Sequence, residues 1–151
     1  MAEMVSLREL LDFAIKREET SAAFFSSVAN RTGDSTLEEI FRTLVKKCVD
    51  RKRALTRLRG LEAHSASNES IPVESFREYL VDVEPRPELT DLQALALGGV
   101  RAETSEKLYG RISLLVSEPR IKEIFEQLWG DHRIHRQLCN CLYDQRLEKE
   151  L

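Results

Sequence analysis

Apolar residues recur at helical spacing in four stretches of this 151-residue chain. Within each stretch they fall three or four positions apart, which is the spacing that lines one face of an α-helix. The pattern therefore predicts four amphipathic helices with one inward face each. The inward positions are Leu7, Leu11, Ala14, Glu18, Ala22, Phe25 and Val28; Leu37, Phe41, Leu44, Cys48, Arg51, Leu55 and Leu58; Leu95, Ala102, Tyr109, Ile112 and Val116; and Ile121, Phe125, Leu128, His132, His135, Cys139 and Leu142.

Two short polar turns, TGDST and SEPR, separate the first helix from the second and the third from the fourth. In the first turn Asp34 or Ser35 is suited to cap the next helix, and Glu38 would complete a capping box with Ser35. In the second turn Pro119 suits a first helical position. Turns this short make the two helices of each pair antiparallel neighbours.

A longer polar segment, AHSASNESIPVESFREYLVDVEPRPELT, joins the two hairpins and holds three of the four prolines. We expect one short helix in it, around Val73–Val81, and its length is sufficient to run from one end of a bundle to the other. The prediction is an all-α four-helix bundle forming a single domain over residues 1–151. Hairpin 1 covers about residues 5–62, the crossover 63–90 and hairpin 2 about 91–149.

The two halves of the chain repeat at an offset of 84 positions. Identities cluster in register, without a gap, which is not expected by chance and indicates an internal duplication of one hairpin. The matched identities are Arg17, Glu19, Thr20, Ser21, Glu39, Ile40, Phe41, Leu44 and Leu58 with Arg101, Glu103, Thr104, Ser105, Glu123, Ile124, Phe125, Leu128 and Leu142.

Polar residues interrupt three of the apolar stripes at one level. The first stripe carries Glu18, the second Cys48 and Arg51, and the fourth His132 and His135. The 84-residue offset matches Cys48 to His132 and Arg51 to His135. We therefore expect these side chains to form one polar layer in the middle of the bundle.

This arrangement resembles the ferritin-like di-iron carboxylate proteins, and the rubrerythrin-type branch in particular. FAIKREETSAAFF resembles the first helix of that branch, with Glu18 followed seven positions later by Phe25. IFRTLVKKCVDR and IFEQLWGDHRIH resemble its metal-bearing second and fourth helices. The resemblance covers nearly the whole chain. It implies a ferritin-like four-helix bundle and a homodimer.

The resemblance also implies a set of metal ligands, which this chain keeps only in part. The family places a Glu on each of two helices and Glu-x-x-His on the other two. Only one of the four carboxylates remains here, and two hard iron ions need more oxygen donors than that. An ordinary di-iron centre is therefore not expected. Position by position, the ligands become Glu18, Cys48-x-x-Arg51, Ala102 and His132-x-x-His135.

Three interpretations of the polar layer remain open. In the first, Glu18, His132 and His135 bind one iron or zinc ion, and the protein is an oxidoreductase with an unknown electron donor. Cys48 would add a thiolate. In the second, Arg51 pairs with Glu18 in place of the metals, and the protein is a metal-free binding or scaffold protein. In the third, the histidines are ordinary core residues.

Composition narrows the possible partners and compartment. The net charge is -3 and the pI is near 5.7, so no general basic surface for nucleic acid is expected. No apolar run reaches the roughly 18 residues of a membrane span, and the N-terminal MAEMVSLREL lacks the apolar core of a secretory signal. The three cysteines do not make a disulfide framework. We expect a cytoplasmic protein that binds neither nucleic acid nor membrane.

Overall fold

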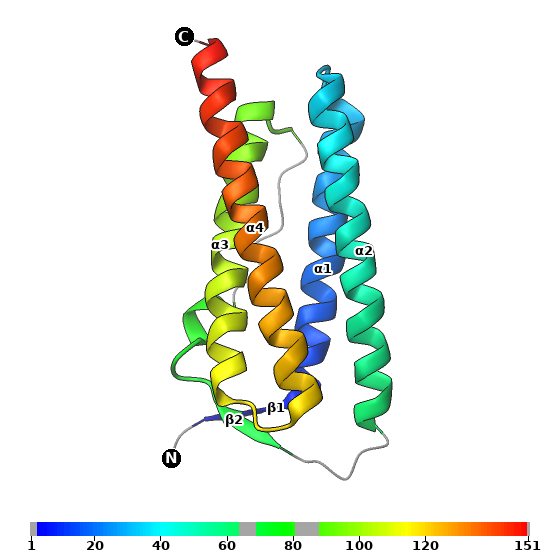
Figure 1. Cartoon of the computed structure of the whole chain (residues 1–151), viewed down its shortest axis with the longest axis vertical. Helices are drawn as coiled ribbons and strands as arrows, with labels where there is room; N and C mark the ends of the chain where they lie inside the picture. The colour runs from blue at the N-terminus through cyan, green and yellow to red at the C-terminus, as the bar shows by residue number, and fades with distance from the viewer. Residues whose placement is uncertain (1–2, 64–68, 81–87, 151) are drawn as a thin grey trace.

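The computed structural model describes residues 3–63, 69–80 and 88–150. In this part of the chain two antiparallel helix pairs stand side by side, α1 with α2 and α3 with α4 (Figure 1). This confirms the predicted four-helix architecture, which is mostly helical and carries one small sheet. The elements in chain order are β1 (Met4–Ser6), α1 (Leu7–Arg31), α2 (Ser35–Ala63), β2 (Ser70–Pro72), the 3₁₀ turn η1 (Arg77–Tyr79), α3 (Asp91–Leu115) and α4 (Pro119–Glu150).

The segment between the hairpins begins at one end of the bundle, and α3 begins at the other (Figure 1). At the first end the Glu69 carboxylate accepts hydrogen bonds from the backbone N–H groups of Ser117 at 2.6 Å and Glu118 at 3.1 Å. At the opposite end Arg31 Nη1 donates to the carbonyl of Leu89 at 3.3 Å. As a result α3 runs antiparallel to α1, as a crossover of bundle length predicts.

A small β-sheet closes the end of the bundle where the N-terminus lies (Figure 1). Strands β1 and β2 pair antiparallel, with Val5 opposite Ile71. The sequence did not predict these strands, because three residues are too few to show an alternating pattern. The short helix expected at Val73–Val81 is reduced to η1, and residue 81 itself, like much of the crossover, lies outside the described residues.

The starts of α1 and α3 repeat at the 84-residue offset. Both helices have 25 residues, and their first residues are 84 positions apart. The Ser6 hydroxyl accepts from Glu9 N at 3.1 Å, and at the matched positions the Thr90 hydroxyl accepts from Gln93 N at 3.2 Å. Thr90 and Gln93 complete a capping box. Equivalent side chains therefore start equivalent helices.

The starts of α2 and α4 repeat in the same way, again 84 positions apart. Asp34, and not Ser35, caps α2, because its carboxylate accepts from Leu37 N at 3.1 Å. At the matched position Glu118 accepts from Ile121 N at 2.8 Å. Carboxylates near helix N-termini also interact favourably with the helix dipole.

The apolar core consists of two clusters with the polar layer between them. One cluster lies near the β-sheet and includes Leu11, Tyr109 and Phe125. The other lies toward the opposite end and includes Phe25 and Phe41. Along each helix the buried polar positions fall between the two clusters, except Ser113 of α3, which lies among the residues of the first cluster. In the described ranges, none of the helices combines the length and the apolar character that a membrane crossing requires.

Candidate functional site

The polar layer is centred on Glu18 of α1, whose residue surface is only 1% exposed. Its Oε1 accepts a hydrogen bond from Arg51 Nε of α2 at 3.1 Å. His132 Nε2 of α4 lies 3.0 Å from the same oxygen. Because an ionised carboxylate can only accept, this contact requires a proton on Nε2. One carboxylate oxygen thus joins three helices.

The charges around Glu18 determine its protonation state. Burial alone would raise the pKa of Glu18, but the hydrogen bond and charge of His132, together with those of Arg51, lower it to about 2. Glu18 is therefore ionised at any physiological pH. A buried carboxylate is tolerated only where it is paired and hydrogen-bonded, and both conditions are met here.

Cys48 and His135 complete the layer but carry no charge at neutral pH. Burial and the negative charge of Glu18 raise the pKa of the Cys48 thiol to about 12. Its sulfur accepts from Arg51 Nη2 at 3.4 Å. Burial and the positive charge of Arg51 lower the pKa of His135 to about 3. The layer thus holds a protonated thiol and a neutral imidazole beside the charged pair.

Two buried polar atoms in the layer, Glu18 Oε2 and His135 Nε2, have no hydrogen-bond partner among the described residues. The His135 ring lies edge-on to the His132 ring, with the centroids 5.6 Å apart. On its other side the His132 ring packs against Tyr109 at 5.5 Å. A buried polar atom without a partner is costly, so these two atoms mark the positions where a ligand or water would bind.

The residues present do not fit a di-iron centre. Of the carboxylates that such a centre needs, the layer holds only Glu18, and the Oε1 atom of that carboxylate is already hydrogen-bonded to His132 Nε2. The Arg51 guanidinium lies within the layer, at the level where a metal would carry the positive charge. Within residues 3–63, 69–80 and 88–150, no three side chains of His, Cys, Asp or Glu come together in a group that could hold a metal ion.

On the α1–α3 side of the layer, two buried arginines exchange hydrogen bonds with two serines. Arg17 Nε donates to the Ser105 hydroxyl at 2.7 Å, and Arg101 Nη2 donates to the Ser21 hydroxyl at 3.0 Å. The two bonds are related by the 84-residue offset. Comparing the two halves of the sequence had matched these four residues as identities, although it predicted no contact between them. The identities were the sequence signal for these bonds.

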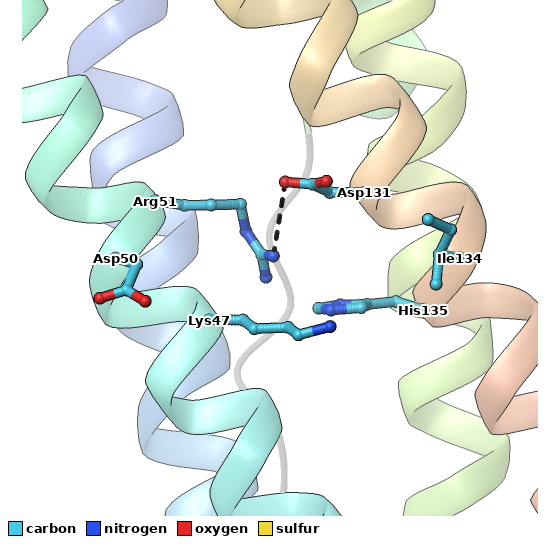
Figure 2. Close-up of a pocket in the computed structure, with 6 residues that line it drawn as sticks. All are labelled: Lys47, Asp50, Arg51, Asp131, Ile134 and His135. Atoms are coloured by element: carbon cyan, nitrogen blue, oxygen red, sulfur yellow. Dashed lines mark ion pairs between the residues drawn. The ribbon is translucent and has the colours of Figure 1, made fainter.

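On the α2–α4 side the layer opens into a pocket of about 200 Å³ (Figure 2). Arg51 and His135 had been assigned to the layer, whereas Lys47 and Asp131 had not been singled out. Their signal was present, because Lys47 and Asp131 are also 84 positions apart and each lies four residues before a layer residue on its helix. The pocket is lined by Lys47, Asp50, Arg51, Asp131, Ile134 and His135.

No protein-family model matches the chain, and no curated protein or solved structure matches it either. The function has to be argued from the geometry of the layer and the pocket. The homodimer, the cytoplasmic location and the lack of nucleic-acid or membrane partners stay predictions.

Proposed function

We propose that this chain is a metal-free four-helix-bundle binding protein of ferritin-like, rubrerythrin-type ancestry, with an ion pair in place of the metals. The observation that supports this proposal is the 3.1 Å contact between Arg51 Nε and Glu18 Oε1. One carboxylate needs one positive charge for neutrality, and Arg51 supplies it without a metal. Its guanidinium stays charged at every accessible pH.

Electrostatic repulsion from Arg51 argues against a divalent ion in the same layer. At an effective dielectric constant of about 20, a dication roughly 5 Å from a guanidinium is repelled by roughly 6–7 kcal/mol. Arg51 is held in place by Glu18 on one side and by the Cys48 sulfur on the other. Releasing it would leave the Glu18 carboxylate to the metal alone.

The ancestry part of the proposal is an internal duplication of one helical hairpin. It is supported by helix starts that recur 84 positions apart and by caps at matched positions. The reciprocal bonds of Arg17 with Ser105 and of Arg101 with Ser21 are what a local two-fold relation between the halves would produce.

A second candidate is an oxidoreductase with one iron or zinc ion at Glu18, His132 and His135. It is favoured by the two atoms without partners, Glu18 Oε2 and His135 Nε2, because both are of the kind that bind metals. In this case Arg51 would have to turn away from the layer, which long arginine side chains can do.

Elemental analysis of the purified protein, after loading with Fe(II) or Zn(II) and removal of excess metal, distinguishes the two. We expect far less than one metal ion per chain in the wild type and increased uptake in Arg51→His. One ion per chain that is lost in a His132→Ala, His135→Ala double variant would refute the metal-free proposal. All variants should carry Cys141→Ser, since Cys141 is exposed and can bind metal adventitiously.

A further inference from the structure

The pocket between α2 and α4 has a cationic floor and an acidic mouth. At the floor, Arg51 is 8% exposed and His135 is 3% exposed. At the mouth, the side chains of Asp50 and Asp131 are 58% and 49% exposed. Since the deepest groups are a guanidinium and an imidazole, a ligand that enters the pocket meets hydrogen-bond donors at its inner end.

Three donors at this pocket make no hydrogen bond within the described residues, and one of them, Arg51 Nη1, makes only a long ion pair. Arg51 Nη1 is 3.9 Å from Asp131 Oδ2, which is too long for a hydrogen bond. His135 Nε2 is buried and has no partner, and the Lys47 ammonium makes no hydrogen bond or ion pair, in the part of the chain that the structure describes. Figure 2 shows Lys47 and His135 extending toward each other from opposite helices.

We propose that this pocket binds a small organic carboxylate, head inward. The carboxylate accepts hydrogen bonds from Arg51 Nη1 and Lys47 Nζ, and a small turn of the His135 ring brings the buried Nε2 of its neutral, Nε2-protonated form within reach. A short alkyl chain packs against Ile134, which forms the apolar part of the lining. A volume of about 200 Å³, at about 30 Å³ per water molecule, holds roughly six or seven non-hydrogen atoms. Butyrate has the corresponding size.

The lining as a whole holds two cationic and two acidic side chains, so the preference for an anion comes from the hydrogen-bond donors at the inner end and not from net charge. At the inner end the Arg51 guanidinium would repel a metal or an amine, whereas a carboxylate matches its planar shape. Asp131 already places a carboxylate near Arg51, but at 3.9 Å and with half of its side chain in solvent. A ligand carboxylate that approaches to hydrogen-bonding distance therefore displaces a loosely held group.

This inference rests on the proposed metal-free centre, because a metal on His135 would occupy the ring nitrogen that the ligand needs. The test is a titration of the full chain with sodium butyrate, followed by two-dimensional amide and side-chain NMR. Sodium chloride at equal ionic strength and butyramide serve as reference titrations. We expect saturable shifts at Lys47, Arg51, Ile134 and His135 with a dissociation constant on the order of 1 mM. Butyramide, which has the same shape but no charge, should produce none.

Substitutions at the rim test the geometry without disturbing the core. Lys47→Met should weaken butyrate binding about three- to fivefold, the effect of a partly exposed ion pair, whereas Lys46→Met on the same helix should leave it unchanged. Asp131→Asn should strengthen binding, because it removes the competing carboxylate. Asp144→Asn, at an exposed position on α4, is its control.

The outcomes separate this inference from the proposed function. Shifts that stay linear in butyrate, equal shifts with butyramide, or equal effects of Lys47→Met and Lys46→Met overturn the carboxylate site. If the same sample contains no metal, the metal-free proposal survives that result. Near-stoichiometric metal that is lost on replacing His135 overturns both.

Discussion

Replacing Arg51 by Met removes the positive charge beside Glu18. The Met side chain keeps the unbranched, apolar stem of Arg51 but lacks its guanidinium. Glu18 is 1% exposed, so its carboxylate cannot turn to water when the guanidinium is lost. Removing one partner of a buried ion pair costs about 3–5 kcal/mol of unfolding free energy. His132 still donates to Oε1, so we expect a loss near the lower end of this range.

The chain provides a matched exposed pair as a control. Arg42 and Glu38 are 3.0 Å apart, nearly the same distance as Arg51 and Glu18, but their side chains are 51% and 43% exposed. Arg42→Met should therefore cost no more than about 1 kcal/mol. The two pairs differ in burial and also in placement, because Arg42 and Glu38 lie one turn apart on α2 whereas Arg51 and Glu18 join two helices, so the difference between the two losses measures both effects together.

Urea denaturation followed by far-UV circular dichroism measures both losses, provided that the m-values stay equal. The double variant Glu18→Gln, Arg51→Met should regain most of the stability, because no unpaired charge is left in the core. If Arg51→Met and Arg42→Met cost the same, the ion pair is not what holds the layer together. If the double variant is no more stable than Arg51→Met, Arg51 contributes packing and not charge.

Two further predictions concern acid stability and the two-fold relation. The folded pKa of His135 is about 3 against an ordinary 6.5, so the unfolded chain binds more protons between these values and stability falls as the pH is lowered. From pH 7.5 to 5.5, a range in which Glu18 stays almost fully ionised in both the folded and the unfolded chain, the loss should be about 1.4 kcal/mol in urea melts and largely absent in His135→Phe. Ser21→Ala and Ser105→Ala should each cost about 1–3 kcal/mol, since each removes an acceptor from a buried arginine. Unequal losses would contradict a symmetric role, and Ser26→Ala on α1 is the control.

The helices and the polar layer could be predicted from the sequence because both depend on periodicity. Every inward position chosen on α1 is buried except Ala22, which is partly buried, and the interruption of the stripe at Glu18 marks the layer. A polar residue on an otherwise apolar stripe has to meet a partner at the same height, so the sequence could place Glu18 level with Arg51 and the two histidines, but it left open which of them Glu18 contacts.

Other features could not be predicted because they depend on details that periodicity does not contain. The β1–β2 pair has only three residues in each strand, which is too short to leave an alternating pattern in the sequence. Ring orientation decides which nitrogen of His132 faces Glu18. It also decides that His135 Nε2 has no partner among the described residues. The pocket was missed because Lys47 is an exposed lysine on a charged helix, and its position four residues before Arg51, one helical turn away, was not used.

The two halves place different residues at matched positions. This difference explains why one layer can hold both an ion pair and a pocket. A symmetric ligand shell would present equal groups from α2 and α4, but here Arg51 is matched by neutral His135 and Lys47 by Asp131. Glu18 uses the Nε side of Arg51, so Nη1 is left facing the pocket. Under the proposed duplication, the two halves diverged after the hairpin was copied. Arg51 then took the place of a metal, and the donors beside it became available to an anion. The same asymmetry predicts that restoring a histidine at position 51 should weaken carboxylate binding while it increases metal uptake.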